Sequence, residues 1–462
     1  MRNPRSNAVA DRAKRPKKSG KKSTAEPLDV SAEYWRKVVP GLHVADAEFL
    51  AGATPLVLSA EMVDRCRTQL QADGFFTLPP DALPWASSLQ AMRIGVRRLI
   101  KRGWPASMLL IYDEAWAMAH QISSLMAAVS GGCANSLDTL AWSVTPCLGQ
   151  SGFAPHRDRQ PADVPGSFRA DGTPKYCTCW VALSAATTDN SCLYLVPRGH
   201  DPGYDEGDDH SPDAEDPLLR VFRSSDAAVQ SVRACPLKPG GVVIFTHRAM
   251  HWGSKGQDGC ADARISISYG FTDPGFEAPY FRSVEQALPF PPVPLRAALA
   301  SAQLINYHER FDFGLPLLRR FGATFNAHRP KFTQEYAEKT AAEYLAACND
   351  LMQRAAAGKS DAQSDAQSDG SPGASLSSAN GQQQEQQEQP QKKKRKKSKA
   401  GAAAFPGMHA GHGWEEEEEE EDEADAALDD ALDAMLDAQA AADGNLFDDF
   451  DADEAVAASD SD

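Results

Sequence analysis

The sequence predicts a mainly β fold, a sandwich or a barrel, with flanking helices and disordered tails at both ends. After residue 141, short apolar or alternating runs follow one another, and each is bounded by Pro, Gly, Asp or Asn. This spacing is typical of β-sandwiches and barrels. Before residue 141 and after residue 294, apolar residues recur at helical spacing instead.

The charge of the chain is concentrated in its ends. The 462 residues carry a formal net charge of −17, but 22 acidic and no basic residues lie in 415–462. Residues 1–22 and 392–399 are strongly basic. Such segments cannot bury enough apolar surface to offset the entropy lost on ordering. We therefore expect a disordered basic tail at 1–27, a folded domain with helical N- and C-terminal flanks at 28–352, and a disordered linker, basic run and acidic tail at 353–462.

Composition also narrows the class of protein. No stretch approaches the roughly 20 consecutive apolar residues of a membrane span, and the basic N-terminus lacks the apolar core of a secretory signal. The nine Cys residues form no small-domain disulfide framework. Reduced thiols are typical of intracellular proteins, so we expect a nuclear or cytoplasmic protein.

The elements follow in order along the domain. Ser59 is a candidate N-cap for a helix over 59–71, and Gly74 ends that helix before a strand at 75–78. Further helices are predicted at 89–101, 114–129, 295–307 and 334–347. Further strands are predicted at 141–145, 176–183, 192–196, 241–246 and 265–271. A long acidic insert lies between Arg198 and Val232 and is a candidate lid.

Three residues in the strand-rich half have the chemistry of a metal site. His156 and Asp158 are two apart, so on an extended strand both side chains project from one face. His251 ends an apolar run that begins at Gly240-Gly241. Two His and one carboxylate, with the opposite face open, are the ligand set of non-haem Fe(II) oxygenases.

A fourth residue adds an anion-binding group. Arg264 lies thirteen residues after His251, and the strand period places Ser266 on the same face. A guanidinium beside a hydroxyl suits the distal carboxylate of a dicarboxylate. Ile265 and Ile267 give the other face the apolar character of a core strand.

An ordered set of motifs between residues 60 and 275 resembles the phytanoyl-CoA dioxygenase family of Fe(II)- and 2-oxoglutarate-dependent oxygenases. The matching stretches are 72–76 (ADGFF), 155–158 (PHRD), 180–183 (WVAL), 188–200 (TDNSCLYLVPRGH), 238–245 (KPGGVVIF), 251–254 (HWGS) and 264–270 (RISISYG). The resemblance implies a double-stranded β-helix core, the jelly-roll or cupin-like fold, and makes 28–352 a dioxygenase domain. The family's Pro-Gly-Ser-His turn reads Pro-Arg-Gly-His at 197–200, and Trp252 is an insertion.

The resemblance also implies residue roles and a reaction. It makes His156, Asp158 and His251 the catalytic iron ligands, and it assigns Arg264, with Ser254 or Ser266, to 2-oxoglutarate. The reaction would hydroxylate a small-molecule or lipid-like substrate and release succinate and CO2. Related halogenases lack a carboxylate at the position of Asp158, so its presence favours hydroxylation. No sequence feature identifies the substrate.

Other residues of metal-ligand type receive structural roles. On an extended strand His247 lies about 13 Å from His251, so the two cannot share an ion and we expect a core or rim role for His247. Cys177 and Cys179 lack a second Cys pair of metal-site spacing and are expected to be small strand residues. His200 is expected to be a turn residue.

Two alternative functions remain open at this stage. The basic run at 392–399, with a second at 12–18, reads as a nuclear-localisation signal, which favours a nuclear oxygenase acting on protein or nucleic acid. The acidic tail could contact a basic protein partner, while its charge argues against simple binding to nucleic acid. The third hypothesis is a non-catalytic nuclear binding module, which would have no physical need for the metal and carboxylate groups.

Overall fold

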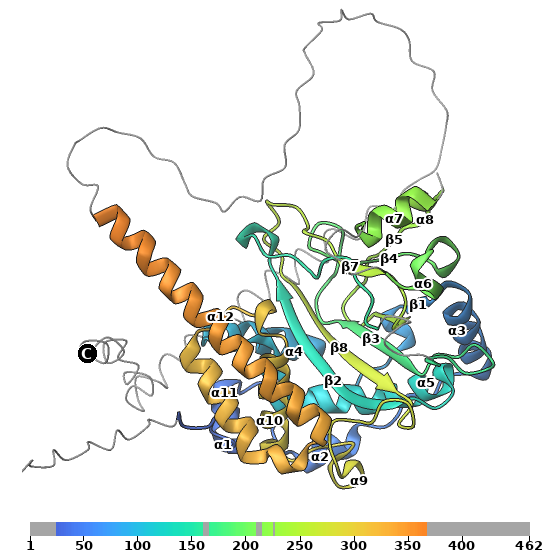
Figure 1. The fold of residues 1–462 in the computed structure, drawn as a ribbon. Coiled ribbons are helices and arrows are strands. Elements are labelled where there is room, and N and C mark those ends of the chain that lie inside the picture. The colour runs from blue at the N-terminus through green and yellow to red at the C-terminus, as the bar shows by residue number, and fades with distance from the viewer. Residues whose placement is uncertain (1–24, 160–165, 209–214, 225–226, 367–462) are drawn as a thin grey trace, which may run out of the picture. The chain divides into compact units, whose positions relative to one another are not determined.

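The computed structural model describes residues 25–159, 166–208, 215–224 and 227–366 (Figure 1). The chain divides into two units, residues 1–367 and 368–462, and every described residue lies in the first. Most of the two tails, with both basic runs and the acidic segment, therefore lies outside the described residues. No helix within the described ranges is long and apolar enough to cross a membrane.

The strands of the described region form two antiparallel sheets. The larger has the order β1-β6-β3-β8-β2 and the smaller the order β5-β4-β7. Their bounds are β1 Phe75–Leu78, β2 Ala134–Val144, β3 Tyr176–Ala182, β4 Leu193–Leu195, β5 Arg233–Cys235, β6 Val242–Thr246, β7 His251–Gly253 and β8 Arg264–Thr272. The predicted β-sheet core with flanking helices is thus confirmed, and the double-stranded β-helix stays a prediction.

Helices lie before, between and after the strands along the sequence. They are α1 Ala32–Val38, α2 Ala47–Gly52, α3 Ala60–Asp73, α4 Leu89–Lys101, α5 Asp113–Ser130, α6 Gly203–Glu206, α7 Pro217–Ser224, α8 Ala228–Ser231, α9 Val284–Ala287, α10 Val293–Asn306, α11 Leu315–His328 and α12 Gln334–Ala366. In the described region they contain more residues than the strands. The expectation that strands would outnumber helices in residues is therefore wrong, because the helical flanks are longer than the sequence pattern indicated.

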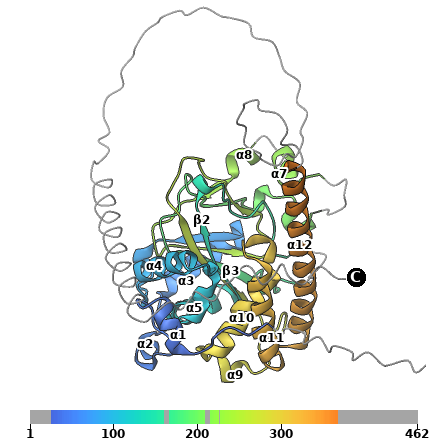
Figure 2. The same ribbon diagram turned by 90° about the vertical axis from the view of Figure 1, so that its left-hand side faces the viewer.

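The two faces of the larger sheet are covered differently. Cys177, Cys179 and Val181 of β3 lie in the main hydrophobic core, which they share with residues of α5 and α10. The alternate residues Trp180 and Ala182 instead pack with side chains of β4 and β5 from the smaller sheet. Figure 2 shows α10, α11 and α12 grouped together on one side. The period of two along β3 thus separates a helix-covered face from a face that looks toward the second sheet.

Strand β2 begins well before its predicted start. Its pairing with β8 shifts register between Asn135 and Thr139, and Leu137 has a φ of 74°. A buried Leu in the left-handed region is strained backbone, and such irregularities re-aim neighbouring side chains. Here the next residue, Asp138, lines a cavity of about 600 Å³.

Candidate metal centre

Backbone pairing brings two distant histidines together. His156 and His251 form an antiparallel bridge, in which each N–H donates to the other's carbonyl oxygen at 3.0 Å. Next to this bridge, Gly152 and Gly253 face each other so closely that a Cβ on Gly152 would lie 2.5 Å from the Gly253 Cα. The two glycines therefore permit the segment before His156 to approach β7.

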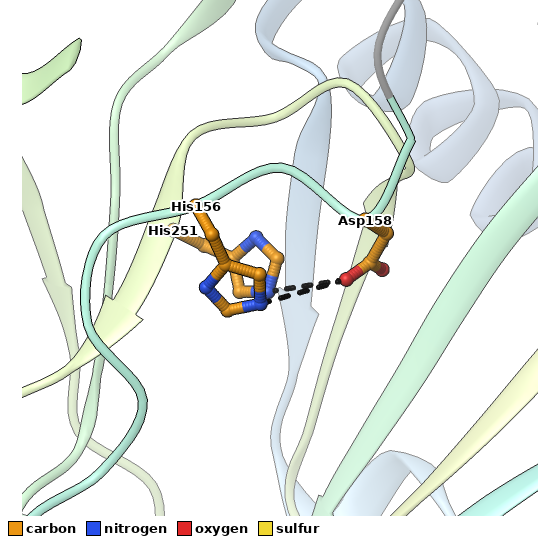
Figure 3. A group of neighbouring side chains, drawn as sticks. All are labelled: His156, Asp158 and His251. Atoms are coloured by element: carbon orange, nitrogen blue, oxygen red, sulfur yellow. Dashed lines mark ion pairs between the residues drawn. The ribbon is translucent and has the colours of Figure 1, made fainter. Parts of the chain in front are cut away.

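The two imidazoles converge on one carboxylate (Figure 3). Asp158 Oδ1 lies 3.7 Å from His156 Nε2 and 3.6 Å from His251 Nε2. One ligand atom from each of the three residues lies within 4.8 Å of the other two. Two ligand atoms at right angles, each about 2.1 Å from an ion, are about 3 Å apart, so small side-chain movements would close this group around a metal. No other such cluster occurs in the described residues.

Hydrogen bonds orient each of the three side chains. His156 Nδ1 lies 2.8 Å from the Ala154 carbonyl oxygen, and His251 Nδ1 lies 3.0 Å from that of Ala249. Only a protonated Nδ1 can donate to a carbonyl, so each Nε2 is left with its lone pair. The Thr178 hydroxyl donates to Asp158 Oδ2 at 2.7 Å. The remaining oxygen of Asp158 is the one that faces the imidazoles.

The electrostatics favour a neutral imidazole and an ionised carboxylate. Burial lowers the pKa of His251 to about 4. Burial alone would raise the pKa of Asp158, but His251, His156 and the Thr178 hydroxyl together hold it below its usual range. Metal ligands must be neutral imidazole and ionised carboxylate, and near neutral pH both of these groups are in that state.

The three side chains line a cavity of about 600 Å³ between the sheets and the C-terminal helices. Strands contribute Thr178, Trp180, Phe245 and Arg264, and the end of α10 with the segment after it contributes residues 306–310. Polar and aromatic groups both line it: Asp138, Trp142, Phe153, Arg159, Tyr176, Tyr307, Arg310 and Glu343. The volume falls within the usual range for small-molecule sites.

Arg264 is a buried cation in the same cavity. It is 3% exposed, its Nη1 donates to Ser266 Oγ at 2.9 Å, and its Nε has no hydrogen-bond partner. No carboxylate of the described residues forms an ion pair with it. Burial lowers its pKa to about 10, so it is still charged at neutral pH. A buried guanidinium without an acid is a binding group for an anionic ligand.

The remaining residues predicted for the site lie at its edge. Ser266 is fully buried and accepts from Arg264. Ser254 follows Gly253 of β7 but does not line the cavity. His247 is also buried, with Nδ1 3.0 Å from the Tyr176 carbonyl oxygen, and it is not part of the metal-ligand cluster. Its predicted core role therefore agrees with its position.

Sequence reasoning missed several contributors to the site. Thr178 lies in the predicted strand 176–183, and the alternation along β3 indicates that it shares a face with Trp180 but not that it lies beside Asp158. The wall formed by residues 306–310 and by Glu343 had no local signal, because it depends on how the C-terminal helices pack. The insert between Arg198 and Val232 was a candidate lid, yet none of its described residues lines the cavity.

The donor set fits Fe(II) and 2-oxoglutarate. Two imidazole nitrogens and one carboxylate leave one side of the ligand group open toward the cavity, as the facial arrangement of non-haem iron sites requires. The partnerless Nε of Arg264 supplies the second half of a dicarboxylate site. These two observations come from different parts of the chain and point to the same pair of ligands.

Comparison with known proteins adds the family. Residues 54–256 match the model of the phytanoyl-CoA dioxygenase (PhyH) family, a range that contains the three clustered residues and ends before Arg264. No curated protein matches the chain.

Several solved structures are similar to the chain. SnoN, a non-haem α-ketoglutarate-dependent epimerase of nogalamycin biosynthesis, is 20% identical, with 46% of this chain and 82% of SnoN covered and a TM-score of 0.34. AviO1 from Streptomyces viridochromogenes Tue57 is 20% identical over 47% of this chain and 98% of its own, with a TM-score of 0.31. EctD from S. alaskensis, a structure with bound Fe, is 15% identical, with 51% of this chain and 82% of EctD covered and a TM-score of 0.34. At such scores these likenesses carry no argument about function.

Proposed function

The chain belongs to the phytanoyl-CoA dioxygenase family through residues 54–256, and from that premise we propose that it hydroxylates a polar small molecule. Members of the family are Fe(II)- and 2-oxoglutarate-dependent oxygenases, and the protein is such a dioxygenase. The observation that carries the proposal is the cluster of His156, Asp158 and His251 in one cavity with Arg264.

In this proposal His156, Asp158 and His251 hold the metal. Their atoms Nε2, Oδ1 and Nε2 face one another, while Nδ1 and Oδ2 are engaged by carbonyl oxygens and by Thr178. Bound Fe(II) supplies the activation of O2. One oxygen atom enters the substrate as a hydroxyl group and the other enters succinate, while 2-oxoglutarate loses CO2.

Arg264 and Ser266 bind the distal carboxylate of 2-oxoglutarate in this scheme. The guanidinium is already oriented by its bond to Ser266 and lies over the Trp180 ring at 5.5 Å. It therefore has little freedom to lose when the carboxylate arrives. Ser254 is the weaker candidate, because its side chain is not exposed to the cavity.

The cavity supports a polar substrate rather than a lipid. Asp138, Arg159, Tyr307 and Glu343 line it, and a long acyl chain lying against these groups would exclude water from them without offering any hydrogen bond in return. A volume of about 600 Å³ suits a small molecule rather than a folded protein or a duplex. We also propose that the two sheets are the halves of a double-stranded β-helix, which the orders β1-β6-β3-β8-β2 and β5-β4-β7 support.

The test is turnover of 2-oxoglutarate by the purified full-length chain. With Fe(II), O2 and 2-oxoglutarate, the protein should release succinate and CO2 in equal amounts, slowly even without a substrate. Asp158→Ala should abolish this release, because it removes a proposed ligand. The proposal fails if 2-oxoglutarate is neither bound nor consumed, or if Asp158→Ala turns it over at the wild-type rate.

A further inference from the structure

Arg157, the residue between two of the proposed ligands, has a fully buried side chain in which every N–H is used. Its guanidinium is 0% exposed and donates five hydrogen bonds. Four go to Asp201 and Asp208, at 2.5 to 3.1 Å, and the fifth goes to the Arg248 carbonyl oxygen at 2.7 Å. A guanidinium has five N–H donors, so no donor is left for solvent or substrate.

Both carboxylates come from the start of the acidic insert. Asp201 and Asp208 have side chains that are 0% and 3% exposed, and α6 lies between them. Gly203 of α6 touches the ion pair directly. A Cβ on this residue would overlap Arg157 Nη2 and Asp208 Oδ1. The insert is therefore fitted closely around the guanidinium.

A second contact fixes the same segment to the larger sheet. The Tyr204 hydroxyl lies 2.8 Å from Thr246 Oγ1 at the end of β6, and the Tyr204 ring packs against Gly74, the C-cap of α3. Thr246 lies five residues before His251. The insert thus joins the loop that carries His156 and Asp158 to the strand that leads toward the third ligand.

The loop around Arg157 has little regular structure of its own. Within 152–159 the structure has one isolated bridge, at His156, and no strand. The backbone bond from Arg159 N–H to the His247 carbonyl oxygen, at 3.1 Å, is the next attachment. Between these two points two side-chain contacts hold the loop: the Thr178 hydroxyl binds Asp158, and the Arg157 guanidinium binds the insert.

We propose that the buried pairs of Arg157 with Asp201 and Asp208 are a brace for the metal centre, with these three as positioning residues. The brace fixes the ligand-bearing loop so that the Asp158 and His156 ligand atoms are held near their metal-bound positions before the metal arrives. Removing one partner of a buried ion pair is strongly destabilising, because the other charge then stays buried without a partner. The inference rests on the proposed function, since it assigns the brace to that same site.

Two variants test the brace by different routes. Asp208→Asn removes one carboxylate and keeps its size, while Gly203→Ala removes no charge but pushes a methyl group against the guanidinium. The matched controls are Asp205→Asn, whose carboxylate is 66% exposed and pairs with Arg198, and Gly199→Ala, whose Cβ would meet nothing within 4 Å. All four changes lie in the same insert.

Anaerobic titration with Fe(II) is the first measurement, and amide hydrogen exchange of the metal-free chain is the second. Both test variants should bind Fe(II) at least about 10-fold more weakly, as is typical when support of a ligand is lost. They should also exchange faster at residues 154–159 while the rest of the chain keeps its wild-type rates. Both controls should match the wild type.

The outcomes separate the brace from the proposed function. Wild-type affinity and wild-type exchange in both test variants would overturn the brace. Faster exchange throughout the chain would also overturn it, because that result describes a general structural role. If the wild-type chain itself binds no Fe(II), the proposed function fails, whereas the exchange at 154–159 still decides whether the insert holds the loop.

Discussion

Arg264 is a buried charge whose partner we expect to be a ligand. Arg264→Met should weaken 2-oxoglutarate binding about 10- to 100-fold, because hydrogen bonds to charged groups contribute about 1.5–3 kcal/mol. Its Fe(II) affinity should stay unchanged, since Arg264 does not contact the three clustered residues. The melting temperature of the ligand-free protein should not fall, because the change removes a buried guanidinium that pairs with no described acid. Calorimetric titration and thermal melting check these expectations, with Arg264→Lys as an intermediate case.

Thr178 orients the carboxylate of Asp158 by binding Oδ2, the oxygen that is not directed at the two imidazoles. Thr178→Val keeps the shape of the side chain and removes the hydroxyl that donates to Oδ2 at 2.7 Å. We expect an Fe(II) affinity at least about 10-fold lower, measured by anaerobic titration. Thr178→Ser keeps the hydroxyl and should retain most of the affinity. Equal affinity in Thr178→Val and the wild type would mean that this bond does not support the metal.

Site residues differ in how far the sequence predicts them. His156, Asp158, His251 and Arg264 could be named from their spacing and order along the chain, although 152–159 forms a loop with one isolated bridge rather than the strand that the two-residue spacing assumed. The Thr178 contact with Asp158 spans 20 positions, and the Arg157 contacts with Asp201 and Asp208 span 44 and 51. Such contacts depend on how strands and insert pack, which local spacing does not encode.

The glycine that joins α3 to β1 is packed against the insert, and its substitution tests that contact. Gly74 ends α3 with a φ of 83°, and a Cβ there would lie 2.9 Å from the Tyr204 ring, whereas Gly103 has a φ of 75° and open space. Gly103→Ala should cost about 1–2 kcal/mol, the price of the left-handed conformation for a residue with a Cβ. Gly74→Ala should cost more, because Tyr204 must also move. Urea unfolding of the two variants measures the difference, and equal losses would contradict the packing of Tyr204 against this turn.

Elements with strong local signals were predicted well. The helices at 89–101 and 114–129 are confirmed as α4 and α5, and Ser59 and Gly74 cap α3 as expected. The short strands β5 and β7 were missed, because neither lies in an apolar run like the one around the equally short β4. The early start of β2 was hidden by the polar residues around its irregular register at Leu137.

The whole folded unit is larger than the part that matches the family. Strand β8 begins after residue 256 and pairs with both β3 and β2, so a fragment of residues 54–256 should not fold. A fragment of residues 25–366 contains both sheets, the metal-ligand cluster and Arg264. It should melt at the full-length temperature and release succinate from 2-oxoglutarate at the full-length rate. Circular dichroism and the succinate assay decide this, and a large loss in the longer fragment would show that the charged ends contribute to the enzyme.

The roles of the charged ends stay predictions. The basic run at 392–399 and the acidic residues at 415–462 lie outside the described residues, as does the run at 12–18. Every group of the proposed chemistry lies between Asp138 and Glu343. The basic segments 1–22 and 392–399 and the acidic segment 415–462 together carry −7, so the remaining residues carry −10 of the net charge of −17.

The most direct test of the central claim is an anaerobic titration of the full-length protein with Fe(II) and 2-oxoglutarate, followed by visible absorption. We expect one Fe(II) per chain and a charge-transfer band that appears only when both ligands are present. The band should be lost in His251→Ala and should require much more 2-oxoglutarate in Arg264→Met. A chain that binds no Fe(II), or a band of unchanged intensity in His251→Ala, would contradict the assignment of this cluster as the iron site.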